Sequence, residues 1–147
     1  MAERFTFRLE KVLAYRRQCE DQARMALAEV SFRYRKQGER LAGLKEDFAA
    51  ARAAFARKKD VTRNDFWLWG NYKLGMEQSI ANAELLLRQI GQEVVRCREN
   101  VIKRSKDRKI LEKFKENQAT QYEQQQKQHE QKELDEISQL RLARQSL

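Results

Sequence analysis

The stretch LEKVLAYRRQCEDQARMALAEVSFRYRKQGERLAGLKEDFAAARAAF, Leu9 to Phe55, decides the fold. Two series of residues run through it, each stepping by seven and offset from the other by three or four. The first is Leu13, Glu20, Leu27, Tyr34, Leu41, Phe48 and Phe55, and the second is Leu9, Arg16, Ala23, Val30, Gln37, Leu44 and Ala51. Most of these residues are apolar, so the pattern predicts a coiled-coil helix. Gln37 is a polar seam residue of the kind that fixes register.

The pattern stops at ARKKDVTRND, residues 56–65, and a second seam follows. Thr62 can cap a new helix there, with Asp65 three positions later completing a capping box. Gly70 and Gly75 offer a second, softer break. The second seam is Met76, Ile80, Ala83, Leu87, Ile90, Val94, Cys97 and Val101, after which the phase shifts to Ile110, Leu111 and Phe114.

Two long helices with a short connection predict an all-α fold, an antiparallel coiled-coil hairpin. We expect one coiled-coil domain over residues 1–147, with helices over about 6–58 and about 64–144 and a turn over about 59–63. With the turn centred near residue 61, residue n faces about residue 122 minus n. Residues past about 118 then lack a partner, and the apolar pattern fades there as well. The second helix is therefore expected to overhang, with residues 119–147 projecting as a single polar helix.

The composition excludes several classes of protein. The 147 residues include no proline and only five glycines, whereas all-β and α/β domains need many turn residues. Charged residues make up 36% of the chain, which leaves few apolar side chains to enclose a substrate pocket. The net charge of +9 favours acidic partners. The opening residues lack a signal-peptide pattern and no apolar run is long enough to span a membrane, so we expect a soluble protein in a reducing compartment.

Few residues could carry chemistry. His129 is the one histidine and has no cysteine near it in sequence, so we expect a solvated side chain rather than a metal ligand. Cys19 and Cys97 fall about 9 Å out of step along the predicted hairpin, which predicts two free thiols. No glycine-rich phosphate loop is present. We expect a protein that is not an enzyme, with no cofactor, no metal and no small-molecule substrate.

Two clusters are unusual. Seven basic residues lie within thirteen positions: Lys103, Arg104, Lys106, Arg108, Lys109, Lys113 and Lys115. They could contact phosphates, but Phe114 is the one aromatic side chain close by, so a solvated face is the plainer interpretation. Near the turn, Phe66, Trp67, Trp69 and Tyr72 lie within seven residues. They either close the end of the coiled coil or form an exposed patch for a protein partner.

The opening FTFRLEKVLAYRRQCEDQARMALAEV, Phe5 to Val30, resembles the N-terminus of the flagellar export protein FliJ family. The block KDRKILEKFKENQATQYEQQQKQHEQKELDEIS, Lys106 to Ser138, resembles the C-terminal region of that family. The resemblance implies a cytoplasmic stalk, peripherally associated with the inner membrane at the flagellar base. It implies binding to the hexameric flagellar export ATPase, to the membrane protein of the export gate and to export chaperones.

For ATPase binding we expect the projecting helix and the basic run to act, with Leu134 and Ile137 seated in the ring. The candidate residues are Lys109, Lys113, Gln131, Lys132, Leu134, Asp135, Glu136 and Ile137. For gate binding the candidates lie at the turn and its flanks: Leu44, Phe48, Trp67, Trp69, Tyr72 and Met76. The alternatives are a basic coiled coil that binds nucleic acid or an anionic membrane surface, and the equivalent stalk of a virulence-type secretion ATPase.

Overall fold

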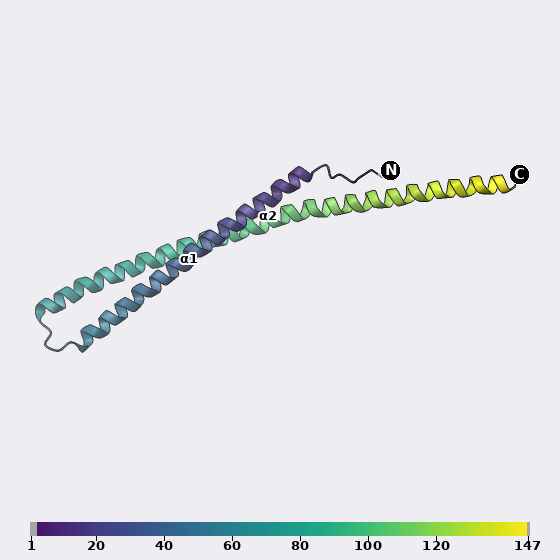
Figure 1. Ribbon diagram of the computed structural model, residues 1–147. Coiled ribbons are helices and arrows are strands. Elements are labelled where there is room, and N and C mark those ends of the chain that lie inside the picture. The colour runs from purple at the N-terminus through teal and green to yellow at the C-terminus, as the bar shows by residue number, and fades with distance from the viewer. Residues whose placement is uncertain (1–2, 147) are drawn as a thin grey trace. The chain divides into compact units, whose positions relative to one another are not determined.

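The computed structural model describes residues 3–146 and consists of two long helices, as Figure 1 shows. Helix α1 is Glu10–Arg57 and helix α2 is Arg63–Gln145. No strand occurs in the part of the chain that the structure describes. The predicted all-α hairpin is confirmed.

The predicted seams are the faces that the two helices bury. All seven buried residues of α1 belong to the predicted seam, and only Tyr34 among its members is exposed. Along α2, every predicted seam residue from Met76 to Val101 is buried or half-buried. The polar seam residues find partners: Arg16 donates to the Asp107 carbonyl at 2.8 Å, and Gln37 donates to the Ala83 carbonyl at 3.2 Å.

The predicted capping box forms where the connection between the helices ends and α2 begins. The Asp65 backbone N–H donates to the Thr62 hydroxyl at 3.2 Å, and the Thr62 N–H donates to the Asp65 carboxylate at 3.0 Å. These two bonds satisfy backbone donors that a helix start otherwise leaves unpaired. Asp60 adopts a left-handed conformation with φ of 56°. The second break does not occur, because α2 runs without interruption through Gly70 and Gly75.

Contacts across the hairpin confirm the predicted register to within a few residues. Phe7 packs on Phe114, with ring centres 6.0 Å apart, and Phe55 packs on Phe66, with ring centres 5.5 Å apart. Arg16 pairs with Asp107, where the predicted register places residue 106.

Helix α1 begins at Glu10, later than the expected residue 6, because residues 3–7 are not helical. An extended segment rises about 3.3 Å per residue, against about 1.5 Å in a helix. The segment therefore reaches further along α2 than a helix would. Phe5 lies 5.7 Å from the Tyr122 ring, and the Tyr122 hydroxyl donates to the Glu3 carbonyl. The expected loss of partners near residue 118 thus shifts to beyond Tyr122.

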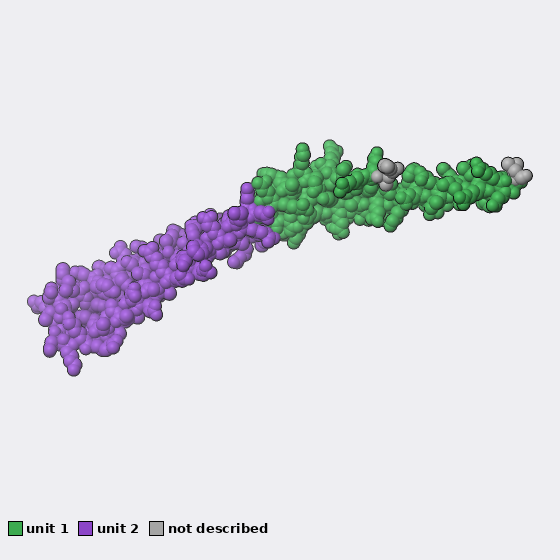
Figure 2. Space-filling model, viewed as in Figure 1, with its two compact units in different colours: residues 1–20, 103–147 green, residues 21–102 purple. Residues whose placement is uncertain are grey.

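The chain divides into two compact units, coloured in Figure 2. Unit 1 comprises residues 1–20 and 103–147, and its core is Phe7, Leu13 and Leu111, with Phe5 and Leu9 against it. Leu13 is fully buried. Unit 2 comprises residues 21–102, including the turn, and buries Ala23, Val30, Leu41, Phe48, Ala83 and Ile90.

Candidate functional site

The C-terminal part of α2 within unit 1 is an uncovered helix. Every residue from 127 to 146 is exposed. Its large apolar side chains are open to solvent: Leu134 is 59% exposed, Ile137 49%, Leu140 65% and Leu142 66%. The polar candidates Gln131, Lys132, Asp135 and Glu136 are exposed as well. A helix with apolar side chains and no neighbour to cover them offers a binding surface.

The polar contacts of this segment lie within the segment itself or one turn before it. His129 pairs with Glu133 at 3.2 Å, and the Gln131 amide donates to Asp135 at 3.0 Å, both four positions apart. Lys127 pairs in the same way with Glu123 at 3.5 Å. Such pairs contribute only about 0.2–0.5 kcal/mol each. The segment therefore relies on intrinsic helix propensity, because residues 127–146 are exposed along their whole length within the described part of unit 1.

The basic run divides between two faces of α2. Arg104 and Arg108 are half-buried on the side that meets α1, whereas Lys103, Lys106, Lys109 and Lys113 are exposed. Ile110, 64% exposed, lies among Lys106, Lys109 and Lys113, and these four residues line one shallow surface groove. No ion pair within residues 3–146 involves these exposed lysines. The candidates Lys109 and Lys113 are thus available to an acidic partner.

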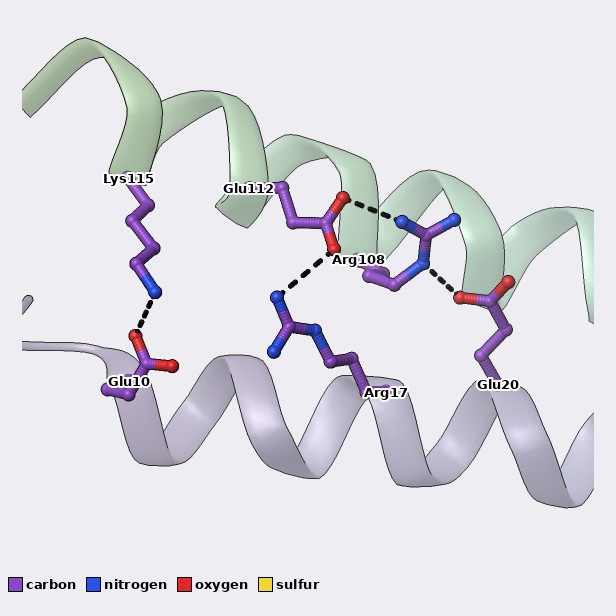
Figure 3. A network of polar contacts seen from close by, with 6 residues as sticks. All are labelled: Glu10, Arg17, Glu20, Arg108, Glu112 and Lys115. Carbon is purple, nitrogen blue, oxygen red and sulfur yellow. Dashed lines mark hydrogen bonds and ion pairs between the residues drawn. The ribbon is translucent and has the colours of Figure 1, made fainter. Parts of the chain in front are cut away.

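The α1-facing residues of the run form an ion network, drawn in Figure 3. Glu20 is buried and accepts a short contact from Arg108, which also binds Glu112 at 2.6 Å. Glu112 in turn lies 3.4 Å from Arg17. The hydrogen bond to Glu20 raises the pKa of Arg108, so its charge is fixed. These residues hold the hairpin together, and their charges are already matched.

Lys115 belongs to the same structural group. Its ammonium lies 2.7 Å from the Glu10 carboxylate at the start of α1, as Figure 3 also shows. Of the seven basic residues noted in the sequence, Arg108 and Lys115 therefore serve the fold, and Arg104 is half-buried on the same side. The remaining four lysines form the free face.

The aromatic cluster beside the turn, in unit 2, also contains side chains that pack on α1 and side chains that are exposed. Trp69 stacks between Phe48 and Phe55, with ring centres 6.3 and 4.9 Å away and planes 7° apart. Tyr72 leans on Trp69 at 5.7 Å. Trp67, two positions from Trp69, points to the other side of α2 and is 64% exposed. Trp69 therefore packs at the end of the coiled coil, as the first interpretation expected, whereas Trp67 is exposed.

The six gate candidates accordingly differ in accessibility. Phe48 is 8% exposed and is further covered by Arg52, whose guanidinium carbon lies 4.6 Å from the ring centre. Leu44, Trp69 and Met76 are half-buried, and Trp67 and Tyr72 are exposed. Phe48 and Trp69 pack the interior of unit 2. Trp67 and Tyr72 are the two of the six whose aromatic side chains are exposed.

Cys19 and Cys97 are free thiols and half-buried. Cys19 lies in a surface pocket with Val12, Tyr15, Arg16, Arg104 and Asp107, and its hydrogen bond raises the pKa of Tyr15. Within residues 3–146, no three metal-ligating side chains come together, and no helix has the length and apolar character of a membrane span.

The positions of some of these residues, inward or outward, could have been predicted from the sequence. Stepping back seven residues from Met76 leads to Trp69, so the second seam already implied that Trp69 is the inward tryptophan. The partner of Trp69, Phe55, is the last residue of the first seam. Ile110 was assigned to a shifted seam with Leu111, yet it lies outside and Leu111 lies inside. Near a phase shift, two adjacent apolar residues give no means of choosing between them.

Comparison with families of known proteins gives a match over nearly the whole chain. The family described as Flagellar FliJ protein matches residues 5–147, which is essentially the whole chain. Neither the curated proteins nor the solved structures contain a match to the chain.

Proposed function

The chain belongs to the flagellar FliJ family, a family of flagellar export-apparatus components, and we propose that it binds the hexameric export ATPase as a stalk. In this proposal it also links the ATPase to the export gate and to substrate chaperones. It hydrolyses no ATP itself and acts at the flagellar base, on the cytoplasmic side of the inner membrane.

The observation that carries the proposal is the uncovered helix over residues 127–146. A single α-helix is only about 10–12 Å wide, so it fits a narrow pore where a two-helix segment does not. Leu134 and Ile137 supply apolar contacts to the ring, and the neighbouring charges of Gln131–Glu136 set the register. The four ion-pair-free lysines, including Lys109 and Lys113, would meet acidic loops of the ATPase.

For the gate, the exposed aromatic side chains Trp67 and Tyr72 are the proposed anchors. Tryptophan and tyrosine bury a large area on binding and are frequent hot spots. Leu44 and Met76 are half-buried and lie further from the turn, where Leu44 lines a surface groove with Ser79 and Asn82, so they would add apolar contacts along the hairpin. Phe48 and Trp69 act from beneath by holding the aromatic cluster in shape.

The deciding experiment measures ATP hydrolysis by the cognate export ATPase with and without this protein, at near-physiological salt. We expect stimulation that disappears when residues 125–147 are deleted. The deletion should leave the melting temperature nearly unchanged, because residues 127–146, which make up most of the removed segment, are exposed. A large fall in melting temperature would mean that the segment packs on the hairpin, and the proposal would fail.

A matched pair of variants locates the contact. Leu134→Ala/Ile137→Ala removes the proposed ring contact and should weaken stimulation at least about tenfold. Leu142→Ala makes the same kind of truncation at a residue that is equally exposed but lies on a different side of the helix. Equal losses of stimulation from both variants would show that the ring does not bind this face of the helix specifically.

The gate contact has its own test. Trp67→Ala/Tyr72→Ala should weaken binding to the cytoplasmic part of the gate protein about tenfold or more. Phe32→Ala removes an aromatic side chain that is similarly exposed, on α1 of the same unit, and serves as the control. Unchanged affinity in the double variant rejects the assignment.

The exposed lysine face favours one second candidate, contact with a phosphate-rich surface such as nucleic acid or an anionic membrane. Binding driven by phosphates loses most of its affinity between low and high salt. Lys106→Gln/Lys109→Gln/Lys113→Gln should then abolish binding to anionic vesicles or to RNA. A virulence-type system is disfavoured, because the matching family is flagellar.

A further inference from the structure

The residues near the end of α2 are arranged symmetrically about Ile137, with apolar residues matched and charges opposite on the two sides. Around Ile137, apolar residues lie three positions away on each side, at Leu134 and Leu140. Acidic residues lie four and seven positions before Ile137, at Glu133 and Glu130, and basic residues lie four and seven positions after it, at Arg141 and Arg144. These seven positions are thus symmetric in apolar character and opposite in charge about Ile137.

These seven positions lie on one face of the helix. At 100° per residue, positions three, four and seven away from Ile137 all fall within an arc of about 120°. They are the positions through which two packed helices touch around a point of closest approach. The structure makes the whole segment helical and leaves every one of the seven exposed.

We propose that this face binds the same face of a second copy of the chain, antiparallel, about a two-fold axis at Ile137. Each residue then faces the one equally far on the other side of Ile137 in the second copy. Leu134 meets Leu140, Glu133 meets Arg141 and Glu130 meets Arg144, and each pair occurs twice. A two-fold interface requires self-complementarity of this kind.

The charges select the antiparallel arrangement. In a parallel pair, Glu130 and Glu133 would face their own copies, and so would Arg141 and Arg144, which places like charges together. In the antiparallel pair all four contacts join opposite charges. No ion pair within residues 3–146 involves Glu130, Arg141 or Arg144, and Glu133 contacts only His129, at 3.2 Å on the surface. The charges are therefore free to be used between copies.

The interface is small, so the association is weak. Three layers of apolar side chains bury less than the roughly 1,000 Å² of a stable complex. We expect a monomer–dimer equilibrium with a dissociation constant on the order of 100 μM, and a weaker one in high salt. The proposal does not rest on ATPase binding. Where both occur, they exclude each other, because both use Leu134 and Ile137.

The test is sedimentation equilibrium of the full-length chain from about 1 μM to 1 mM, with two charge-reversed variants. Glu130→Arg/Glu133→Arg makes the face wholly basic, and Arg141→Glu/Arg144→Glu makes it wholly acidic. Each variant alone should dimerise at least about tenfold more weakly. An equimolar mixture should form a one-to-one dimer at least as tight as the wild type, because all four contacts again join opposite charges.

Three results would overturn the proposal. One is a chain that stays monomeric at 1 mM, and another is unchanged dimerisation by both charge variants. The third is a mixture that associates no better than the separate variants. Far-ultraviolet circular dichroism of each variant verifies that the helix is retained.

Crosslinking distinguishes the orientation. In a background of Cys19→Ser/Cys97→Ser, Ile137→Cys should oxidise to a disulfide dimer, because the two copies of residue 137 meet at the axis. Leu134→Cys alone should crosslink poorly, but it should crosslink with Leu140→Cys when the two are mixed. Efficient self-crosslinking of Leu134→Cys would indicate a parallel pair and contradict the proposal.

Discussion

Two stretches of the same helix, residues 104–122 and 127–145 of α2, are both rich in charged residues and differ in surroundings. In the first stretch the polar residues on the side that meets α1 find partners there: Arg108 binds Glu20, Lys115 binds Glu10 and Asp107 accepts from Arg16. In the second stretch all residues are exposed and the polar contacts are local. The first stretch is held by the fold, and the second depends on its own sequence.

The difference shows how one helix can form part of the hairpin at one end and offer an exposed surface at the other. In proteins most of the stability of a helix comes from tertiary packing, because the first turn is costly to form. The paired stretch supplies a continuous template from which the unpaired stretch extends, so the cost of helix nucleation is met upstream. The unpaired stretch can then remain helical and still present all of its faces to partners.

The largest expected contrast is in amide hydrogen exchange. Seam amides of the paired region, such as those of Leu111 and Glu112, should exchange only through opening of unit 1, with protection on the order of 10³ or more. Amides over residues 129–143 should be protected less than about tenfold, since fraying from the end exposes them. Mass-spectrometric exchange of the isolated chain measures both. Equal protection would remove the distinction between the two stretches.

Truncating apolar side chains should reveal the same contrast in stability. Leu13 is fully buried in unit 1, so Leu13→Ala should cost about 2–5 kcal/mol in the free energy of unfolding. Leu142→Ala, at an exposed position, should change it by less than about 0.5 kcal/mol. Urea denaturation followed by circular dichroism gives both values. A similar cost for the two substitutions would mean that residue 142 is covered in solution.

Removing the cap at the start of α2 should lower the stability less than Leu13→Ala does. Thr62→Ala removes the hydroxyl that accepts from the Asp65 N–H, and loss of such a cap costs about 1 kcal/mol. The midpoint of thermal unfolding should fall, whereas exchange of residues 129–143 should not change. Thr62→Ser keeps the hydroxyl and is the control. A fall of the same size with serine would contradict a capping role.

The smallest effect concerns pH. The hydrogen bond from the Thr62 backbone, together with Lys58 3.2 Å away, holds the pKa of Asp65 below its ordinary value of 3.8. The stabilisation is therefore fully present above pH 3.8 and is lost as the pH falls from there through the lowered pKa. The difference in melting temperature between wild type and Asp65→Asn should shrink across this window. A difference that stays constant from pH 5 to pH 2.5 would show that the carboxylate charge does not matter.

The sequence predicted what depends on periodicity and local chemistry. The heptad series located the buried face of α1 from Leu13 to Phe48, and Thr62 and Asp65 located the start of α2. Register followed from the position of the turn alone. Each of these features is decided by residues close to one another in the chain or by a repeat, so a single sequence contains the needed information.

What the sequence left undetermined depends on contacts between distant segments. The non-helical course of residues 3–7 follows from packing of Phe5 and Phe7 against α2, which no local pattern encodes. The basic run gave no sign of which cations serve the fold, because that depends on where Glu10, Glu20 and Glu112 lie. Among the candidate binding residues, only the phase of the second seam separates inward Trp69 from outward Trp67, whereas the contacts of Trp69 with Phe48 and Phe55 depend on how α1 and α2 pair.

The left-handed turn at Asp60 makes the two helices separable. The residues from Lys58 to Asp60 are exposed and lie outside both helices, so opening the chain there leaves the seams and the capping box intact. Fragments 1–60 and 61–147 should therefore recombine as two chains, with an affinity that depends on concentration where the intact protein's pairing does not. Such a split pair, with each half fused to part of a reporter, would turn formation of the hairpin into a readable signal inside a cell.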